Sequence, residues 1–171
     1  MSILKVDQIQ LSNGNTPTAG DLGINDTGTV LQVVHNQSNS ANAQTTSTSY
    51  VSWGTAPQAA ITPKATNSKI LILAQVGMQL DASGQVENTI ERAISGGASS
   101  MLDGGTTYGL SFHGTSASGG IWKDTHITRV DTPNTTSAVT YKWYGRSENG
   151  ANVHIDHGGA TNSMVLIEIA G

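Results

Sequence analysis

Alternating apolar residues make residues 69–80 the clearest strand in the sequence. Read with a period of two, one face of this segment is wholly apolar and carries Ile70, Ile72, Ala74, Val76, Met78 and Leu80. Leu71 and Leu73 share the other face with polar residues, and turn formers bound the segment at both ends. A helix would be interrupted by Gly77. We therefore predict a long strand at the centre of an antiparallel sheet.

Weaker versions of this pattern predict further strands along the chain. They cover residues 29–35, 49–53, 86–94, 106–113, 137–147 and 164–169, whereas 36–48 reads as a long polar loop and 121–130 as a less regular stretch. Asn149 and Gly150 form a strong hairpin signal, so residues 151–156 are predicted to pair with 137–147. Strands at this spacing, with Gly and Asn turns and no helical pattern, predict an all-β fold, an antiparallel jelly-roll sandwich.

The first residues read differently from the rest. Residues 3–10 alternate without a clear apolar face, and residues 11–23 are rich in turn formers and too polar to hold a core. We predict an extended N-terminal attachment arm and linker over residues 1–28 and the jelly-roll domain over 29–171. The alternative is an ordinary edge strand and loop of the main domain, and the sequence leaves both open.

Composition limits the partners. Charged residues make up only 12% of the 171 residues, with a net charge of −4 and a pI near 5.6. A nucleic acid or an anionic membrane would need a basic patch, so we expect neither as a partner. Without cysteine the chain has no disulfide or thiolate site. A surface this poor in charge suits a protein that packs against copies of itself or other proteins.

Leader and membrane segments are not expected either. Lys5 and Asp7 interrupt the apolar residues that a signal peptide would need. The longest purely apolar run, residues 70–74, is far shorter than the roughly 18 residues of a membrane span. We therefore expect a protein that has no membrane-spanning segment and is assembled in a cytoplasm.

Five stretches together resemble a known family. They are residues 4–10 (LKVDQIQ), 61–63 (ITP), 68–72 (SKILI), 135–141 (TTSAVTY) and 163–170 (SMVLIEIA). Their order is similar to that in the C-terminal jelly-roll module of tail-fibre-like and capsid decoration proteins of tailed phages. The resemblance covers about residues 29–171 and the short opening, and none of its motifs is catalytic.

The resemblance implies a homotrimer similar to tumour-necrosis-factor-like jelly rolls, located on the virion surface and assembled in the host cytoplasm. Its partners would be the major capsid protein or tail and baseplate proteins, with a host surface glycan as a further possibility. Ile3, Leu4, Val6 and Ile9 would bind the partner by adding a strand to it. The chain has no shaft-like segment, which favours a capsid decoration (cement) protein over the alternative, a short tail fibre or receptor-binding module.

His154 and Asp156 are the one pair of residues that suggests a metal site. On a strand they share a face, and three copies near a trimer axis would offer imidazole nitrogens to Zn²⁺ or Fe²⁺. No further ligands lie at metal-site spacing, and a solvated hairpin end explains the pair more simply. We therefore expect neither a metal nor another cofactor.

Searches for catalytic groups also favour a non-enzymatic protein. Glu87 and Glu91 would share one side of a strand as a glycosidase pair, but they are most simply solvated. A catalytic triad could be assembled from a nearby serine with His113, Asp124 and His126. A polar loop is the simpler interpretation, because residues 114–118 lack the last glycine of the nucleophile motif. Most of the tyrosines and tryptophans are expected in the core or an interface, although a sugar-stacking platform is the other use open to them.

Overall fold

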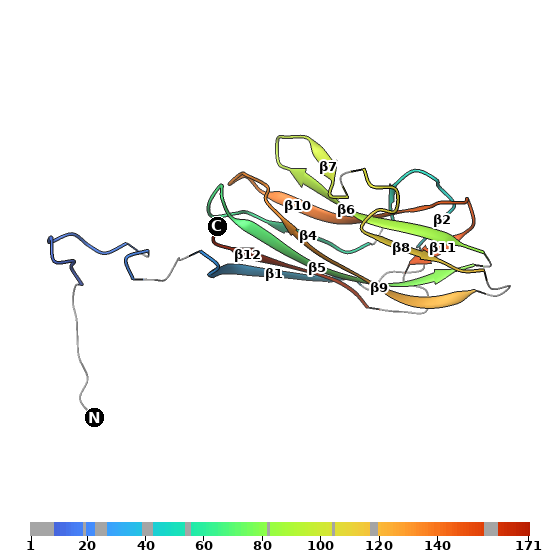
Figure 1. Cartoon of the computed structure of the whole chain (residues 1–171), viewed down its shortest axis with the longest axis horizontal. Coiled ribbons are helices and arrows are strands. Elements are labelled where there is room, and N and C mark those ends of the chain that lie inside the picture. The colour runs from blue at the N-terminus through green and yellow to red at the C-terminus, as the bar shows by residue number, and fades with distance from the viewer. Residues whose placement is uncertain are drawn as a thin grey trace, which may run out of the picture.

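The computed structural model describes residues 9–18, 20–22, 27–38, 43–53, 56–81, 83–103, 105–116, 120–155 and 161–171, and these form strands but no helix. The strands are β1 (Val30–Ser38), β2 (Ala43–Thr45), β3 (Val51–Ser52), β4 (Gln58–Ile61), β5 (Lys69–Leu80), β6 (Gln85–Ile94), β7 (Ser99–Met101), β8 (Ser111–Gly114), β9 (Ile121–Asp131), β10 (Val139–Ser147), β11 (Val153–Ile155) and β12 (Asn162–Ile169). They form two antiparallel sheets that lie as two layers (Figure 1).

The first layer, sheet A, is organised around β5. One side of β5 pairs with β9 along nearly its whole length, and the other pairs first with β12 and then with β11. β1 pairs with β12, and β2 pairs with β11. The sequence prediction of a central strand at residues 69–80 is therefore confirmed.

The second layer, sheet B, is organised around β10 and β6, which pair with each other from Val139 and Ile94 to Ser147 and Val86. The far side of β10 pairs with β4 and then β3, while the far side of β6 pairs with β7 and β8. Along the chain, β1 and β2 lie in sheet A, β3 and β4 in B, β5 in A, β6 to β8 in B, β9 in A, β10 in B, and β11 and β12 in A. This alternation between two antiparallel sheets is the jelly roll that the sequence predicts.

The core lies between the two sheets. All six apolar residues on the predicted inner face of β5 are buried, and so are Val139, Tyr141 and Trp143 on β10. Two buried indole groups in this core are paired: the Trp143 indole N–H donates to Asn88 Oδ1 at 3.1 Å, and the Trp53 indole N–H donates to the Gly145 carbonyl at 3.1 Å. Each long strand therefore turns one face inward, as the alternation in the sequence requires.

Glu168 on β12 is a buried carboxylate at the edge of this core. Its Oε2 accepts a hydrogen bond from Gln32 Nε2 at 2.5 Å, and its Oε1 accepts bonds from Ser68 Oγ and the Lys64 backbone N–H, both at 2.6 Å. Burial raises the pKa of this carboxyl, but these hydrogen bonds outweigh that effect and hold the pKa below its usual value. Glu168 thereby ties β1, β12 and the turn before β5 together.

Several sequence predictions about strands were wrong. Residues 121–130 form the regular strand β9, and the predicted 36–48 loop contains the end of β1 and all of β2. Of the predicted 106–113 strand, only residues 111–113 belong to a strand, β8. Residues 151–156 do not form a hairpin with 137–147, because β11 pairs with β2 and β5 in the other sheet. Both edges of β10 are already occupied, by β6 on one side and β3 and β4 on the other.

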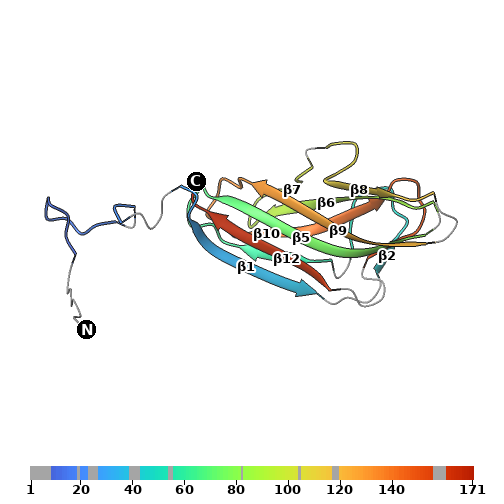
Figure 2. The ribbon, with the colours of Figure 1, turned by 60° about the horizontal axis from the view of Figure 1, so that its bottom comes forward.

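The described part of the N-terminal segment forms no strand. Between residues 9 and 22 its hydrogen bonds are local, such as those between Leu11 and Asn15 and between Thr18 and Asp21, whereas Gly28 bonds to Ala170 beside β12. Figures 1 and 2 show residues 9–18 and 20–22 apart from the two sheets, beyond the end where β1 begins and β12 finishes. The arm over residues 1–28 stays a prediction, and residues 1–8 lie outside the described residues. No helix in the described ranges is long and apolar enough to span a membrane.

Candidate interaction surface and polar sites

The outer side of sheet A carries a continuous apolar surface near the end where the chain enters β1. We define this outer apolar face as Val33, Leu71, Leu73, Val130, Val165, Ile167 and Ile169. The strand register places these residues side by side, since Val33 faces Ile167, Ile167 faces Leu71, and Leu71 faces Val130. The face therefore crosses four adjacent strands, β1, β12, β5 and β9, which Figure 2 shows next to one another.

These side chains remain accessible to solvent in the single chain. Val33 is 58% exposed, Val130 is 52% exposed and Leu73 is 38% exposed. β5 and β12 are apolar on both faces around residues 70–73 and 164–167, a pattern typical of strands that are covered on both sides. One side is covered by sheet B, so the sequence of these strands indicates that the other side is covered as well.

The dimensions of sheet A suit an interface between proteins. Four strands about 4.8 Å apart and a β5 length of about 36 Å give an outer side of roughly 700 Å². Each partner in a standard protein interface contributes about 800 Å². None of the seven residues of the outer apolar face is charged, while Lys69 and Asp124 on the same side of the sheet are exposed. An apolar centre with charges at its margin is the usual arrangement of an interface.

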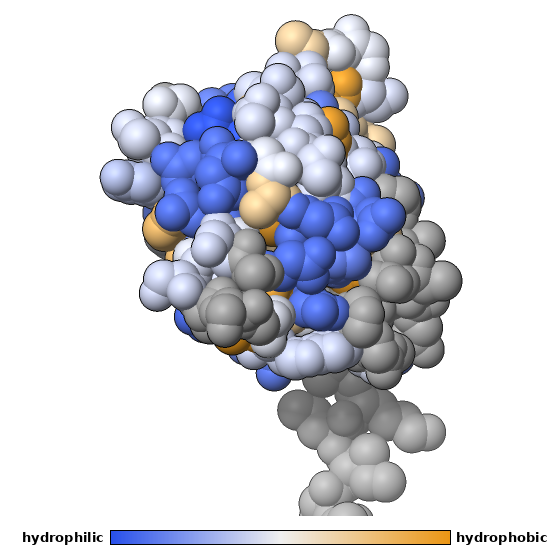
Figure 3. All heavy atoms as spheres, turned by 90° about the vertical axis from the view of Figure 1, so that its right-hand side faces the viewer, coloured by the Kyte–Doolittle hydropathy of each residue, from blue (hydrophilic) through white to orange (hydrophobic). Residues whose placement is uncertain are grey.

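The opposite end of the sandwich is polar. Figure 3 views that end and shows mainly hydrophilic residues among those it colours. Near this end, His154 of β11 faces Gln79 of β5 and Gln44 of β2, and it therefore lies on the outer side of sheet A. Apolar and polar character thus separate along the length of one sheet.

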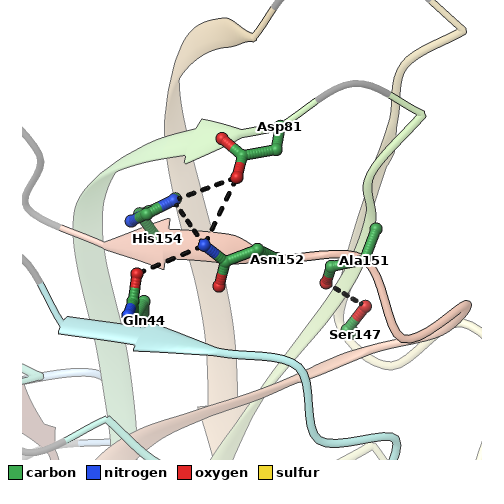
Figure 4. Close-up of polar contacts among 6 residues, drawn as sticks. All are labelled: Gln44, Asp81, Ser147, Ala151, Asn152 and His154. Carbon is green, nitrogen blue, oxygen red and sulfur yellow. Dashed lines mark hydrogen bonds and ion pairs between the residues drawn. The ribbon is translucent and has the colours of Figure 1, made fainter.

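His154 belongs to a small polar cluster (Figure 4). Its Nε2 lies 3.0 Å from Asn152 Nδ2 and 3.4 Å from Asp81 Oδ2. Asn152 Nδ2 also approaches Asp81 Oδ2 at 3.3 Å and donates to Gln44 Oε1 at 3.2 Å. Nearby, the Ser147 hydroxyl donates to the Ala151 carbonyl at 2.7 Å and shapes the crossing from sheet B to sheet A. The cluster holds β2, β5 and β11 together at this end.

The predicted solvated hairpin end at His154 is therefore wrong, because the side chain is only 8% exposed and lies within a sheet. Asp156, its predicted companion in a metal site, lies outside the described residues. Within the described ranges, no three His, Cys, Asp or Glu residues lie close enough together to hold a metal ion. The cluster pairs one imidazole with one carboxylate and two amides, a set that suits structural hydrogen bonding.

Glu87 also differs from its prediction. It points to the outer side of sheet B as expected, yet it is fully buried. Arg146 on the neighbouring strand binds its Oε2 through Nε at 3.0 Å and Nη2 at 2.8 Å, and the Tyr50 hydroxyl donates to the same oxygen at 3.2 Å. Burial, then the negative charges of Asp103 and Glu87, raise the pKa of Tyr50.

Glycine at position 109 lets the β7–β8 connection approach this cluster. Its φ is +63°, and a Cβ there would lie 2.7 Å from the Tyr50 hydroxyl and 2.6 Å from the Asn88 carbonyl oxygen. Glycine alone fits such a backbone. The connection thus packs against Tyr50, whose hydroxyl binds Glu87, a residue that the strand pattern alone places in solvent.

The remaining candidate residues are dispersed. His113 lies on β8 in sheet B, whereas Asp124 and His126 lie on the outer side of β9 in sheet A. Burial and the charge of Lys123 lower the pKa of His113. Of the predicted partner-binding residues, Ile9 is exposed, and Ile3, Leu4 and Val6 lie outside the described residues. Trp53, Tyr141 and Trp143 are core residues, whereas Tyr108 and Trp122 are more than half exposed, so the core holds fewer of the aromatics than predicted.

Sequence reasoning identified the side of β5 that carries Leu71 and Leu73 but missed the surface that they form. The missing information is the register with β12 and β9, which joins these leucines to Ile167, Val165 and Val130. A usable signal was present in residues 164–167, where apolar residues occupy successive positions rather than alternate ones.

Comparisons with known proteins identify no family for this chain. No family model matches the chain. No curated protein sequence matches it either. Among solved structures, the chain is similar to one in "Structure of infectious bursal disease virus Gx strain", with a TM-score of 0.39 and 10% identity. The similarity covers 83% of this chain and 33% of that one, so this chain spans about a third of the length of its structural neighbour.

Proposed function

We propose that this chain is a structural protein of a virion, a homotrimeric jelly-roll knob that decorates and stabilises a capsid through its N-terminal arm. The observation that supports this most is the outer apolar face of sheet A. Burying it against two other copies would remove from water seven apolar side chains that the single chain leaves partly exposed.

The arrangement of the chain supports the attachment part of the proposal. Residues 9–18 and 20–22 lie beyond the end of the sandwich at which β1 begins (Figure 1). The Gly28 N–H donates to the Ala170 carbonyl at 2.8 Å, and the Ala170 N–H donates to the Thr29 carbonyl at 2.8 Å, so the chain is fixed to the knob just before β1. An arm of about 28 residues reaches at most roughly 90 Å, which suits gripping a nearby surface.

Light scattering on the purified chain tests the assembly. We expect a mass three times 17.7 kDa for the native chain. Leu73→Glu should yield monomers with little loss of thermal stability, since Leu73 is partly exposed in the single chain and an unpaired carboxylate would be buried in the trimer. Tyr108→Glu is the matched control on the sheet B side, and it should remain trimeric. A monomeric native chain, or a trimeric Leu73→Glu variant, would contradict this interface.

Removing residues 2–24 tests the attachment separately. We expect a folded trimer that no longer binds capsids, and capsids without it should resist heat or osmotic shock less well. Binding that survives the deletion would contradict the role of the arm, and a few trimers found only at a tail would favour the short-fibre alternative.

A further inference from the structure

A second surface lies on the other side of the molecule, over the outer side of sheet B. It is an open hollow of about 450 Å³ bordered by Tyr50, Met101, Asp103, Thr106, Thr107 and Arg146. This volume is within the roughly 300–1,000 Å³ of sites that bind small molecules. The hollow lies directly above the buried Glu87, since both Tyr50 and Arg146 hydrogen bond to that residue.

The hollow is bordered by both hydrogen-bond acceptors and donors. Asp103 is only 7% exposed, and its Oδ1 accepts the Gly105 N–H at 3.1 Å. Arg146 uses Nε and Nη2 to bind Glu87, which fixes the guanidinium in place while further N–H groups remain on it. The Thr107 hydroxyl can donate and accept, whereas the Thr106 hydroxyl donates to the Gly109 carbonyl at 3.1 Å and is left as an acceptor. The rigid parts of this arrangement are therefore a carboxylate and a guanidinium.

The apolar parts of the hollow come from Tyr50 and Met101. The Arg146 guanidinium stacks over the Tyr50 ring, 4.8 Å from the ring centre. The Tyr50 hydroxyl is held by Glu87, so the ring has a fixed orientation. A thioether and an aromatic ring beside a carboxylate and a guanidinium form a surface that is both apolar and polar.

The charge of the hollow selects against anions. Glu87 and Asp103 carry two negative charges, and Arg146 carries one positive charge that Glu87 already neutralises. The Oε1 atom of Glu87 is buried and has no hydrogen-bond partner among the described residues. With two negative charges against one positive charge, the hollow keeps a net negative charge, and a negatively charged ligand would be repelled.

We propose that this hollow binds a neutral pyranose unit of a glycan. Vicinal sugar hydroxyls donate and accept at once, which matches a carboxylate beside a guanidinium and two threonine hydroxyls. The C–H face of the ring matches Tyr50 and Met101. This binding activity goes beyond the structural role proposed above and does not depend on trimerisation, since the hollow and the outer apolar face lie on different sheets.

Amide NMR on the ¹⁵N-labelled full chain tests the proposal. The probes are glucose, galactose, mannose and N-acetylglucosamine, with N-acetylneuraminic acid as the anionic probe and ethylammonium as the cationic probe, each up to about 50 mM. We expect at least one neutral sugar to shift the amides of residues 103, 107 and 146 in a saturable manner, and neither charged probe to compete with it.

Two variants and one control make the outcome specific. Asp103→Asn should weaken sugar binding at least about tenfold, because it removes a charged acceptor. Thr107 is exposed, so Thr107→Val should weaken sugar binding without affecting folding. Thr128→Val on sheet A should bind as the native chain does. The proposal is wrong if no neutral sugar shifts these amides, if a charged probe binds them more tightly, or if both hollow variants bind normally. Each of these results leaves the trimer test unaffected.

Discussion

Replacing Glu168 by Gln should destabilise the protein substantially although the two side chains have the same shape. Glu168 is fully buried on β12, and its two oxygens accept bonds from Gln32, Ser68 and the Lys64 N–H. The amide of Gln has only one oxygen, so its NH₂ group must face at least one of these donors. One or two donors then lose their acceptor in a place that water does not reach.

The expected cost follows from these contacts. A buried donor without an acceptor costs about 1–3 kcal/mol, and bonds to a charged acceptor are stronger than those to a neutral amide. We therefore expect a loss of about 2–4 kcal/mol in the free energy of unfolding at pH 7. This is a large part of the 5–15 kcal/mol typical of a domain.

Urea unfolding followed by circular dichroism, repeated from pH 7 to pH 3, measures the effect. Because the pKa of Glu168 is lowered on folding, its charge stabilises the protein fully above the unfolded pKa near 4.3, and this contribution disappears as pH falls through the folded value. The gap between native and variant proteins should therefore be largest at neutral pH and shrink in acid. Glu148→Gln, at an exposed position, serves as control and should change stability by less than about 0.5 kcal/mol.

Two results would refute this reasoning. A variant within about 0.5 kcal/mol of the native protein at pH 7 would show that the three donors find other acceptors. A gap that stays constant down to pH 3 would show that the charge of Glu168 is not its source.

Two further predictions concern packing. Ile72→Asp should unfold the protein or lower its melting temperature strongly, since Ile72 is fully buried and an unpaired buried carboxylate costs several kcal/mol. Gln75→Asp on the outer side of β5 should have a mild effect, and equal effects of the two substitutions in thermal melts would mean that the faces of β5 are assigned wrongly. Gly145→Ala should lower the free energy of unfolding, measured in urea, by about 1–3 kcal/mol, because the new Cβ would lie 2.7 Å from Trp53 Cζ2. Gly97→Ala, where the nearest atom to a new Cβ is at 3.5 Å, should cost less than half as much, and similar losses at both glycines would contradict the tight packing of Trp53.

The sequence predicted the fold class and the best strands because a sandwich buries one face of each long strand. β5, β10 and β12 alternate apolar and polar residues for this reason, or are apolar throughout. β9 was less evident because only Thr125 and Ile127 of its residues are buried, so its alternation is weak. It is a strand because it pairs with β5 from Ile70 to Leu80, which no local pattern reveals.

The candidate surfaces depended still more on tertiary structure. Asn149 and Gly150 form a turn, and Gly150 has the positive φ that the pattern suggests, but the chain then crosses to sheet A instead of returning along β10. Glu87 faces outward as its position on the strand requires, yet it is buried, and the connection through Gly109 packs against Tyr50, whose hydroxyl binds it. In both cases the local chemistry was read correctly and a distant segment decided the outcome.

The position of β12 has a consequence for synthesis of the chain. β12 lies between β1 and β5, although it is translated after every other strand of the sandwich. Until it leaves the ribosome, β1 has no neighbour in sheet A, and the strand edge of β5 along residues 69–75 stays unpaired. Sheet A therefore completes only once β12 has been synthesised, through contacts between residues more than 100 positions apart, and such folding is slow. Nascent chains interrupted before residue 162 would expose apolar strand edges that pair readily with other chains.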